Sequence, residues 1–181
     1  MDDEPVTPAG RFAYALSFLL HDEGGFTDDP DDPGGATNLG ITQNDLSLVA
    51  SKLHLPANVQ SLTRNDAATY YKAIWWDRHN YNAINSLIIA TKVFDIAVNM
   101  GAERAHTLLQ KALHCVGYGL KLDGILGAKT IAATNECCLH GRQDDLLDEL
   151  REESVHYYQL ITEENPKLYK FLKGWLTRAQ E

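Results

Sequence analysis

Hydrophobic residues recur every three or four positions over most of this chain, which is the spacing of one buried face of an α-helix. No clear alternation of apolar and polar residues, the mark of a half-buried β-strand, appears outside residues 26–41. The pattern therefore predicts an all-α, mainly helical fold with at most a small β-hairpin in that stretch. The predicted helices are residues 11–21, 43–52, 65–78, 87–100, 103–114, 143–163 and 167–178.

Local signals place several helix ends. Thr42 and Thr63 are each followed three residues later by an aspartate, Asp45 and Asp66. This spacing is typical of a capping box. The threonine side chain accepts a hydrogen bond from the backbone N–H of the acidic residue, and the acidic side chain accepts one from the backbone N–H of the threonine. Residues 1–9 are polar and contain two prolines, and we expect them to be poorly ordered.

The predicted helix 87–100 is apolar on nearly all sides, which indicates a buried, central helix. Within it, Asp95 and Asn99 are one turn apart and therefore share a face. Buried polar groups require hydrogen-bond partners. We expect a structural hydrogen-bonding role for Asp95, and we take Asn99 as a candidate substrate contact.

The stretch 23–42, EGGFTDDPDDPGGATNLGIT, is too long and too polar for an ordinary connection. Glu23 follows the predicted helix 11–21, which the glycines at 24 and 25 are expected to end. A carboxyl group at the negative end of a helix, beside apolar groups such as Phe26, has a raised pKa. Such a group can act as a general acid at neutral pH.

Glycoside hydrolysis requires a second carboxylate. Asp32, nine residues after Glu23 and beyond the Pro30 turn, is the candidate, with Asp29 and Asp31 as competitors. Thr37 could position a water molecule. The aspartate cluster also fits a solvated turn or a weak calcium loop, but it lacks the spacing of an EF-hand. We predict no metal site and no cofactor.

Trp75 and Trp76 are adjacent on a predicted helix, so they cannot share one face. One ring is expected to pack inward and the other to lie near the surface, where it could stack on a sugar. Both are therefore candidate substrate contacts. The alternative is that both rings belong to the core, because helical aromatic residues are more often buried.

The net charge of -9 argues against nucleic acid as a partner, because its binding requires basic patches. No apolar run approaches the ~20 residues of a membrane span. The acidic first residues do not resemble a Sec signal. We therefore expect synthesis in the cytoplasm without a signal peptide. The odd number of cysteines, Cys115, Cys137 and Cys138, is a poor disulfide framework.

The stretch 23–42 closely resembles the opening of glycoside hydrolase family 108. The members of this family are N-acetylmuramidases, found in phage endolysins and in bacterial muramidases that serve lysis or protein export. The resemblance rests on Glu23-Gly24-Gly25-Phe26, Asp32-Pro33-Gly34-Gly35-Ala36-Thr37-Asn38 and Gly40-Ile41-Thr42. It implies that Glu23 is catalytic and that the fold is lysozyme-like. By analogy with the Glu-Asp-Thr triad of phage-type lysozymes, it adds Asp32 and Thr37. Asn38, in the same motif, is a candidate substrate contact.

Two later segments resemble known regions. Residues 94–101 resemble the start of the family's second conserved region, and residues 123–130 resemble the DGxxGxxT turn of peptidoglycan-binding modules, with Thr130 a possible helix cap. A plain helix-to-helix turn explains the second segment equally well. The predicted organisation is a catalytic region, 10–90, and a peptidoglycan-binding-like region, 91–181, packed as one compact body. The last helix carries basic residues that could touch anionic wall polymer or lipid, or form a solvated face: Lys167, Lys170, Lys173 and Arg178.

These observations predict a peptidoglycan hydrolase that cleaves the β-1,4 bond between N-acetylmuramic acid and N-acetylglucosamine, with Glu23 as the general acid. Whether the reaction retains or inverts configuration depends on the distance between the carboxyl groups. The alternatives are a lytic transglycosylase acting on the same bond and a non-catalytic peptidoglycan-binding protein. We expect a monomer that acts on glycan strands in the periplasm or outside the cell, with a holin or a secretion system for export.

Overall fold

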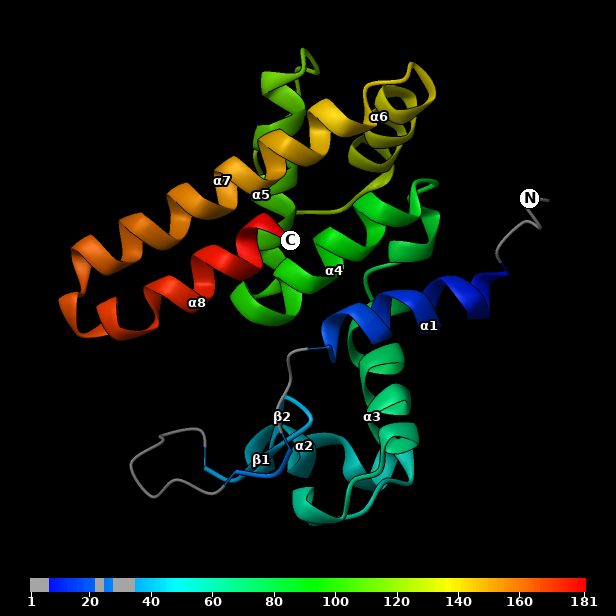
Figure 1. The fold of residues 1–181 in the computed structure, drawn as a ribbon. Helices are drawn as coiled ribbons and strands as arrows, with labels where there is room; N and C mark the ends of the chain where they lie inside the picture. Colours follow the sequence, from blue (N-terminus) through cyan, green and yellow to red (C-terminus); the bar gives the residue numbers. More distant parts are fainter. Residues whose placement is uncertain (1–6, 22–24, 28–34) are drawn as a thin grey trace. The chain divides into compact units, whose positions relative to one another are not determined.

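The computed structural model describes residues 7–21, 25–27 and 35–181. The chain divides into two compact units, Met1–Arg78 and His79–Glu181, which we describe separately (Figure 1). Among the described residues there are eight α-helices and one two-stranded sheet, so the predicted all-α fold with a small hairpin is confirmed. The division into regions 10–90 and 91–181 followed family resemblance and stays a prediction. No helix in the described ranges is both long and apolar enough to cross a membrane.

In the N-terminal unit, α1 (Pro8–Leu19) begins earlier than its hydrophobic pattern predicted. The Thr7 hydroxyl caps it by accepting a hydrogen bond from the Gly10 N–H at 3.1 Å. Pro8 takes the first helical position, where a proline loses no hydrogen bond. The helix ends at Leu19, where the Leu20 N–H donates to the Leu16 carbonyl at 3.0 Å, and not at the glycines.

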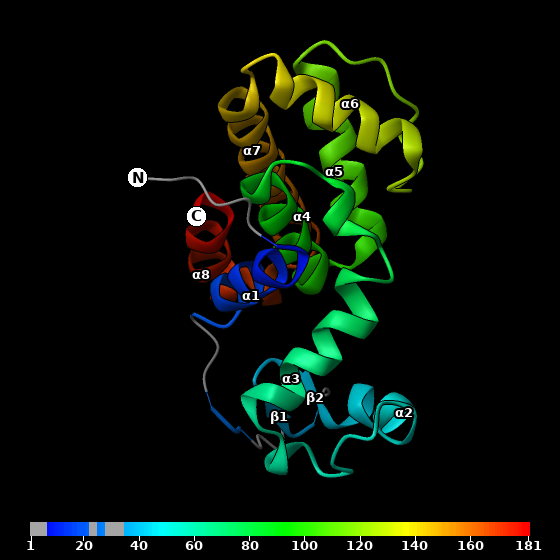
Figure 2. The same ribbon diagram turned by 90° about the vertical axis from the view of Figure 1, so that its right-hand side faces the viewer.

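A β-hairpin follows, formed by β1 (Thr37–Asn38) and β2 (Ile41–Thr42) with Thr37 opposite Thr42. Its two turn residues, Leu39 and Gly40, have φ values of 52° and 73°. Two left-handed residues in succession are the requirement of a type I′ turn, which matches the natural twist of paired strands. The hairpin lies beside α2 (Gln43–Leu53) (Figure 2).

The predicted threonine caps are confirmed. The Thr42 hydroxyl accepts from the Asp45 N–H at 3.1 Å at the start of α2. Thr63 and Asp66 form a reciprocal capping box at the start of α3 (Arg64–Tyr71), with distances of 3.2 and 2.9 Å. A short 3-10 turn, η1 (Val59–Ser61), connects the two helices. The expected single α-helix to residue 78 is interrupted, because α3 continues as a π-helical turn, η2 (Lys72–Trp76).

The C-terminal unit is built around α4 (Leu87–Met100), which is buried over most of its length as predicted. After the short turn η3 (Tyr81–Ala83), the chain packs α5 (Ala102–Cys115) against α4, and α7 (Gln143–Glu164) against both. A 3-10 turn, η4 (Pro166–Leu168), reverses the chain so that α8 (Tyr169–Gln180) runs beside α7 (Figure 1).

The helix α6 (Ala128–Leu139) corrects one expectation, because Gly127 and not Thr130 occupies its N-cap position. Thr130 is buried inside the first turn. Its hydroxyl donates to the Ile125 carbonyl and accepts from the Gln110 side chain, both at 3.2 Å. The threonine therefore fixes the preceding turn against α5 and leaves the helix end uncapped by a side chain.

Candidate active site

The described part of the predicted catalytic stretch is a short backbone ladder. Thr27 and Thr37 exchange two hydrogen bonds, each 2.8 Å long, and Thr37 pairs on its other side with Thr42. Glu23 and Asp32 lie outside the described residues. In the sequence, Thr27 follows Glu23 by four positions and Thr37 follows Asp32 by five. The ladder therefore joins residue 27 to residue 37, and nothing more is described of the stretch between them than residue 35 and residue 36.

Thr37 itself is half-buried, and its hydroxyl donates a long hydrogen bond of 3.3 Å to the Gly35 carbonyl. The hydroxyl oxygen retains its capacity as an acceptor. The paired strand fixes the backbone of Thr37, and a hydroxyl on such a support can accept a hydrogen bond from a water molecule.

Asn38, the next residue of the strand, is buried and holds the hairpin in place. Its side-chain N–H₂ group donates to the carbonyls of Val59 and Leu62, at 3.0 and 3.3 Å. The Tyr71 hydroxyl donates to the Leu39 carbonyl at 3.0 Å and fixes the turn. The Asn38 N–H₂ group is thus bonded within the protein, and the assignment of Asn38 as a substrate contact stays a prediction. The local sequence gives no signal of this structural role, because the carbonyls that accept from Asn38 belong to residues 21 and 24 positions away in the chain.

The tryptophan pair divides as expected, with one ring inside and one nearer the surface. Trp76 is 1% exposed, and the centre of its ring lies 5.7 Å from the centre of the Phe12 ring. Trp75 is half-buried and hydrogen-bonds the side chain of Tyr70. Trp76 is therefore a core residue, and Trp75 is the member of the pair whose ring can meet a ligand. Both belong to the π-helical turn η2, a feature that is frequent at functional sites.

Asp95 has the structural role predicted for it. It is 3% exposed, and one carboxylate oxygen accepts from the Nη2 and Nε atoms of Arg178 at 2.8 and 3.1 Å. The Lys92 ammonium donates to the Arg178 carbonyl at 2.8 Å, and burial lowers the pKa of Lys92 to about 8. Arg178 is therefore turned inward and is not part of the basic surface expected on the last helix.

Asn99 is exposed at the C-terminal end of α4. Its side-chain N–H₂ group donates to the Asp95 carbonyl at 2.7 Å, one turn earlier. This contact ties the amide to its own helix. The assignment of Asn99 as a substrate contact stays a prediction.

The turn at residues 123–127 is fastened to α5 by Gln110, which is 1% exposed. The Gln110 side chain donates to the Asp123 carboxylate at 2.9 Å and accepts from the Gly124 N–H at 3.0 Å. Gly124 has a φ of +68°, and a Cβ atom there would lie 2.6 Å from Cγ of Glu103. Only glycine fits this position, so the structure explains the first glycine of the DGxxGxxT pattern.

The same turn is held by His106. Nδ1 lies 3.0 Å from the Gly124 carbonyl and Nε2 lies 3.1 Å from the Tyr81 hydroxyl. Because a carbonyl can only accept, Nδ1 carries the proton and Nε2 accepts from the tyrosine. Burial lowers the pKa of His106 to about 4, which keeps the ring neutral near pH 7. This histidine is a structural residue.

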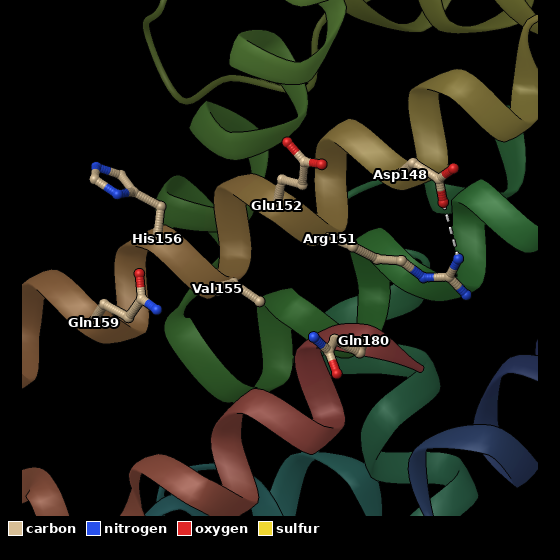
Figure 3. A pocket seen from close by; sticks show the side chains of 7 residues that line it. All are labelled: Asp148, Arg151, Glu152, Val155, His156, Gln159 and Gln180. Atoms are coloured by element: carbon tan, nitrogen blue, oxygen red, sulfur yellow. Dashed lines mark hydrogen bonds and ion pairs between the residues drawn. The ribbon is translucent and has the colours of Figure 1, made fainter.

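The C-terminal unit contains several concave surfaces. One pocket, of about 400 Å³, lies along α7 beside the end of α8. Figure 3 shows its lining, where Val155 and Gln180 face each other and Arg151 reaches toward Asp148, to which it is paired at 3.2 Å. A second pocket, of about 430 Å³, lies at the corner between α4 and α5. No cluster of potential metal ligands occurs within residues 7–21, 25–27 and 35–181.

Comparisons with known proteins cover both parts of the chain. Residues 16–101 match the family model described as Glycosyl hydrolase 108, and residues 104–180 match one described as Predicted Peptidoglycan domain. Among solved structures, SagA of Brucella abortus is similar at 32% sequence identity and a TM-score of 0.74, and the match covers 94% of this chain and 90% of that one. No curated protein matches. The first family match includes Glu23, Asp32 and Thr37.

Proposed function

Because this chain belongs to the glycosyl hydrolase 108 family, we propose that it is an N-acetylmuramidase. The two family matches together make it a glycoside hydrolase that acts on peptidoglycan. The proposal adds the bond, which is the β-1,4 linkage between N-acetylmuramic acid and N-acetylglucosamine. It also adds the residues that perform the reaction.

In this proposal Glu23 protonates the glycosidic oxygen as the bond breaks, which is the role of a general acid. Asp32 acts on the other side of the sugar, either as the base that activates water or as a charge that stabilises the cationic transition state. Thr37 accepts a hydrogen bond from the attacking water and orients it. Trp75 offers its ring to the apolar face of a pyranose.

The observation that carries the proposal is the ladder of Thr27, Thr37 and Thr42. Paired backbone hydrogen bonds join Thr27 to Thr37, which follow Glu23 and Asp32 by four and five positions in the sequence. The hairpin is secured to the rest of its unit by Asn38 and Tyr71. A rigid support of this kind is what precise placement of catalytic groups requires.

Mass spectrometry of the products released from purified peptidoglycan tests this proposal. The proteins compared are the wild type, Glu23→Gln, Asp32→Asn and, as a matched control, Glu163→Gln, an exposed glutamate near the end of α7. We expect reducing muramic acid ends from the wild type and the control, and none from Glu23→Gln.

Other products give other conclusions. Anhydro-muramic acid ends would replace the hydrolase with a lytic transglycosylase, and reducing glucosamine ends would indicate a glucosaminidase. Equal activity of the wild type and Glu23→Gln would exclude Glu23 as the acid. Wall binding without any product from the wild type would favour a non-catalytic binding protein.

A further inference from the structure

The pocket at the corner between α4 and α5 contains charged groups that the proposed reaction does not use. Its volume of about 430 Å³ is within the range of small-ligand sites. Two helices of the C-terminal unit and the corner between them supply the lining, which also includes one aromatic ring from α7. The lining residues are Met100, Gly101, Ala102, Glu103, Arg104, Thr107 and Tyr157.

Arg104 is held in this pocket by an aromatic ring. Its guanidinium carbon lies 4.6 Å from the centre of the Tyr157 ring, a distance typical of a cation–π contact. Within the described parts of the chain, Arg104 makes no hydrogen bond or ion pair through its side chain. The ring thus restrains the guanidinium group while its N–H donors stay available.

We propose that this pocket binds a carboxylate of peptidoglycan through Arg104, a site separate from the catalytic stretch. The inference rests on the proposed function for the identity of the polymer. A guanidinium group presents a planar pair of donors that matches the two oxygens of a carboxylate. Peptidoglycan carries such groups on its stem peptides and, where the peptide has been removed, on the lactyl ether of muramic acid.

Glu103 lines the same pocket beside Arg104, and its carboxylate also has no ion pair among the described residues. It would repel a bare anion but would accept hydrogen bonds from an amino group. A ligand that carries both a carboxylate and an amine, as a stem peptide does, therefore complements the pocket better than a simple acid.

The charge of the whole chain favours short-range contacts over long-range attraction as the source of binding. With a net charge of -9 the protein has no long-range attraction to an anionic polymer. Binding must then come from a few directed contacts. A preorganised arginine is a contact of this type, because little side-chain freedom is lost when the ligand arrives.

Isothermal titration of the full-length protein with three probes tests the site. The probes are a stem tetrapeptide, the disaccharide N-acetylglucosaminyl-N-acetylmuramic acid and neutral chitobiose. None of them contains the bond that the proposed muramidase cleaves, so binding is measured independently of catalysis. The variants are Arg104→Gln, Arg104→Lys and the matched control Arg64→Gln, an exposed arginine of the N-terminal unit.

We expect Arg104→Gln to weaken binding of a carboxylate-bearing probe by roughly ten-fold or more, as for loss of a charge-assisted hydrogen bond. Arg64→Gln should bind as the wild type does. A loss of affinity for the tetrapeptide would identify the stem peptide as the source of the bound carboxylate. A loss of affinity for the disaccharide would identify the lactyl group as that source. We expect Arg104→Lys to lose most of the affinity, because lysine has no planar fork.

Three results would overturn the inference. The first is that Arg104→Gln weakens binding of neutral chitobiose as much as binding of the acidic probes. The second is that the Arg104→Gln and Arg64→Gln proteins bind both acidic probes with equal affinity. The third is that neither acidic probe binds to the wild type. Arg104 is exposed, so a thermal melt should show that Arg104→Gln leaves the fold intact. Product analysis of the same variant reports on the proposed function separately.

Discussion

The buried ion pair between Asp95 and Arg178 offers the sharpest test of how the C-terminal unit is held together. Their side chains are 4% and 19% exposed, and the two residues are 83 positions apart in the sequence. The substitution Asp95→Asn keeps the shape of the side chain and removes its charge. Arg178 would then lose the carboxylate that pairs with it in this contact.

Removing one partner of a buried ion pair costs about 3–5 kcal/mol. Small domains have a free energy of unfolding of about 5–15 kcal/mol. This loss of free energy is thus a large fraction of the total stability, and it corresponds to a fall in Tm of roughly 15–25 °C for a domain of about 100 residues. Urea unfolding followed by circular dichroism measures the change.

The exposed pair Lys72–Asp77 provides the matched control, since its side chains are 47% and 55% exposed. Asp77→Asn should cost no more than about 1 kcal/mol. The double substitution Asp95→Leu with Arg178→Met should recover much of the loss, because packed apolar groups can replace a buried pair. The reasoning is refuted if Asp95→Asn costs no more than Asp77→Asn.

Three further predictions concern single residues. The pKa of Lys92 is lowered by burial to about 8, so the folded state binds fewer protons than the unfolded state between about pH 8 and pH 10. The contribution of Lys92 to the free energy of unfolding should therefore rise with pH across that window; in urea titrations the difference in free energy of unfolding between the wild type and Lys92→Met should rise with pH, and a difference that does not change with pH would contradict the assignment. Gly124→Ala should cost about 2–4 kcal/mol, since a Cβ would clash with α5 in addition to the strain of positive φ. Gly141→Ala, with φ of +75° and open space, should cost only about 1–2 kcal/mol, and equal thermal melts for the two would disprove the clash. Asn38→Ala leaves two carbonyls without their donor and should cost about 1–3 kcal/mol; it should also lower kcat more than it raises KM, and an unchanged kcat would remove the positioning role.

The helices and their caps were predictable because they depend on neighbours in the chain. The spacing of apolar residues indicated each helix that the structure contains except α6. The capping box of Thr63 and Asp66 joins residues three positions apart, so its sequence pattern is also its contact. The start of α1 was missed because Pro8 was taken as a sign of disorder, although proline is favourable in a first turn.

The family and the candidate acid were also accessible from the sequence. The motif around Glu23 is a continuous stretch, and a continuous stretch can be recognised without knowledge of the fold. The Glycosyl hydrolase 108 match over residues 16–101 agrees with it. The role of Glu23 stays a prediction, since that residue lies outside the described ranges.

Contacts between distant segments required the tertiary structure. Arg178 was counted with the lysines of the last helix, and only the packing of α8 turns it toward Asp95. The hydrogen bonds from Asn38 to the carbonyls of Val59 and Leu62 likewise depend on residues that are distant in the chain. Local sequence determined the helices, the caps and the motif because these depend on short-range geometry. The fold alone decided which polar groups are buried and paired, because burial and pairing depend on residues far apart in the chain.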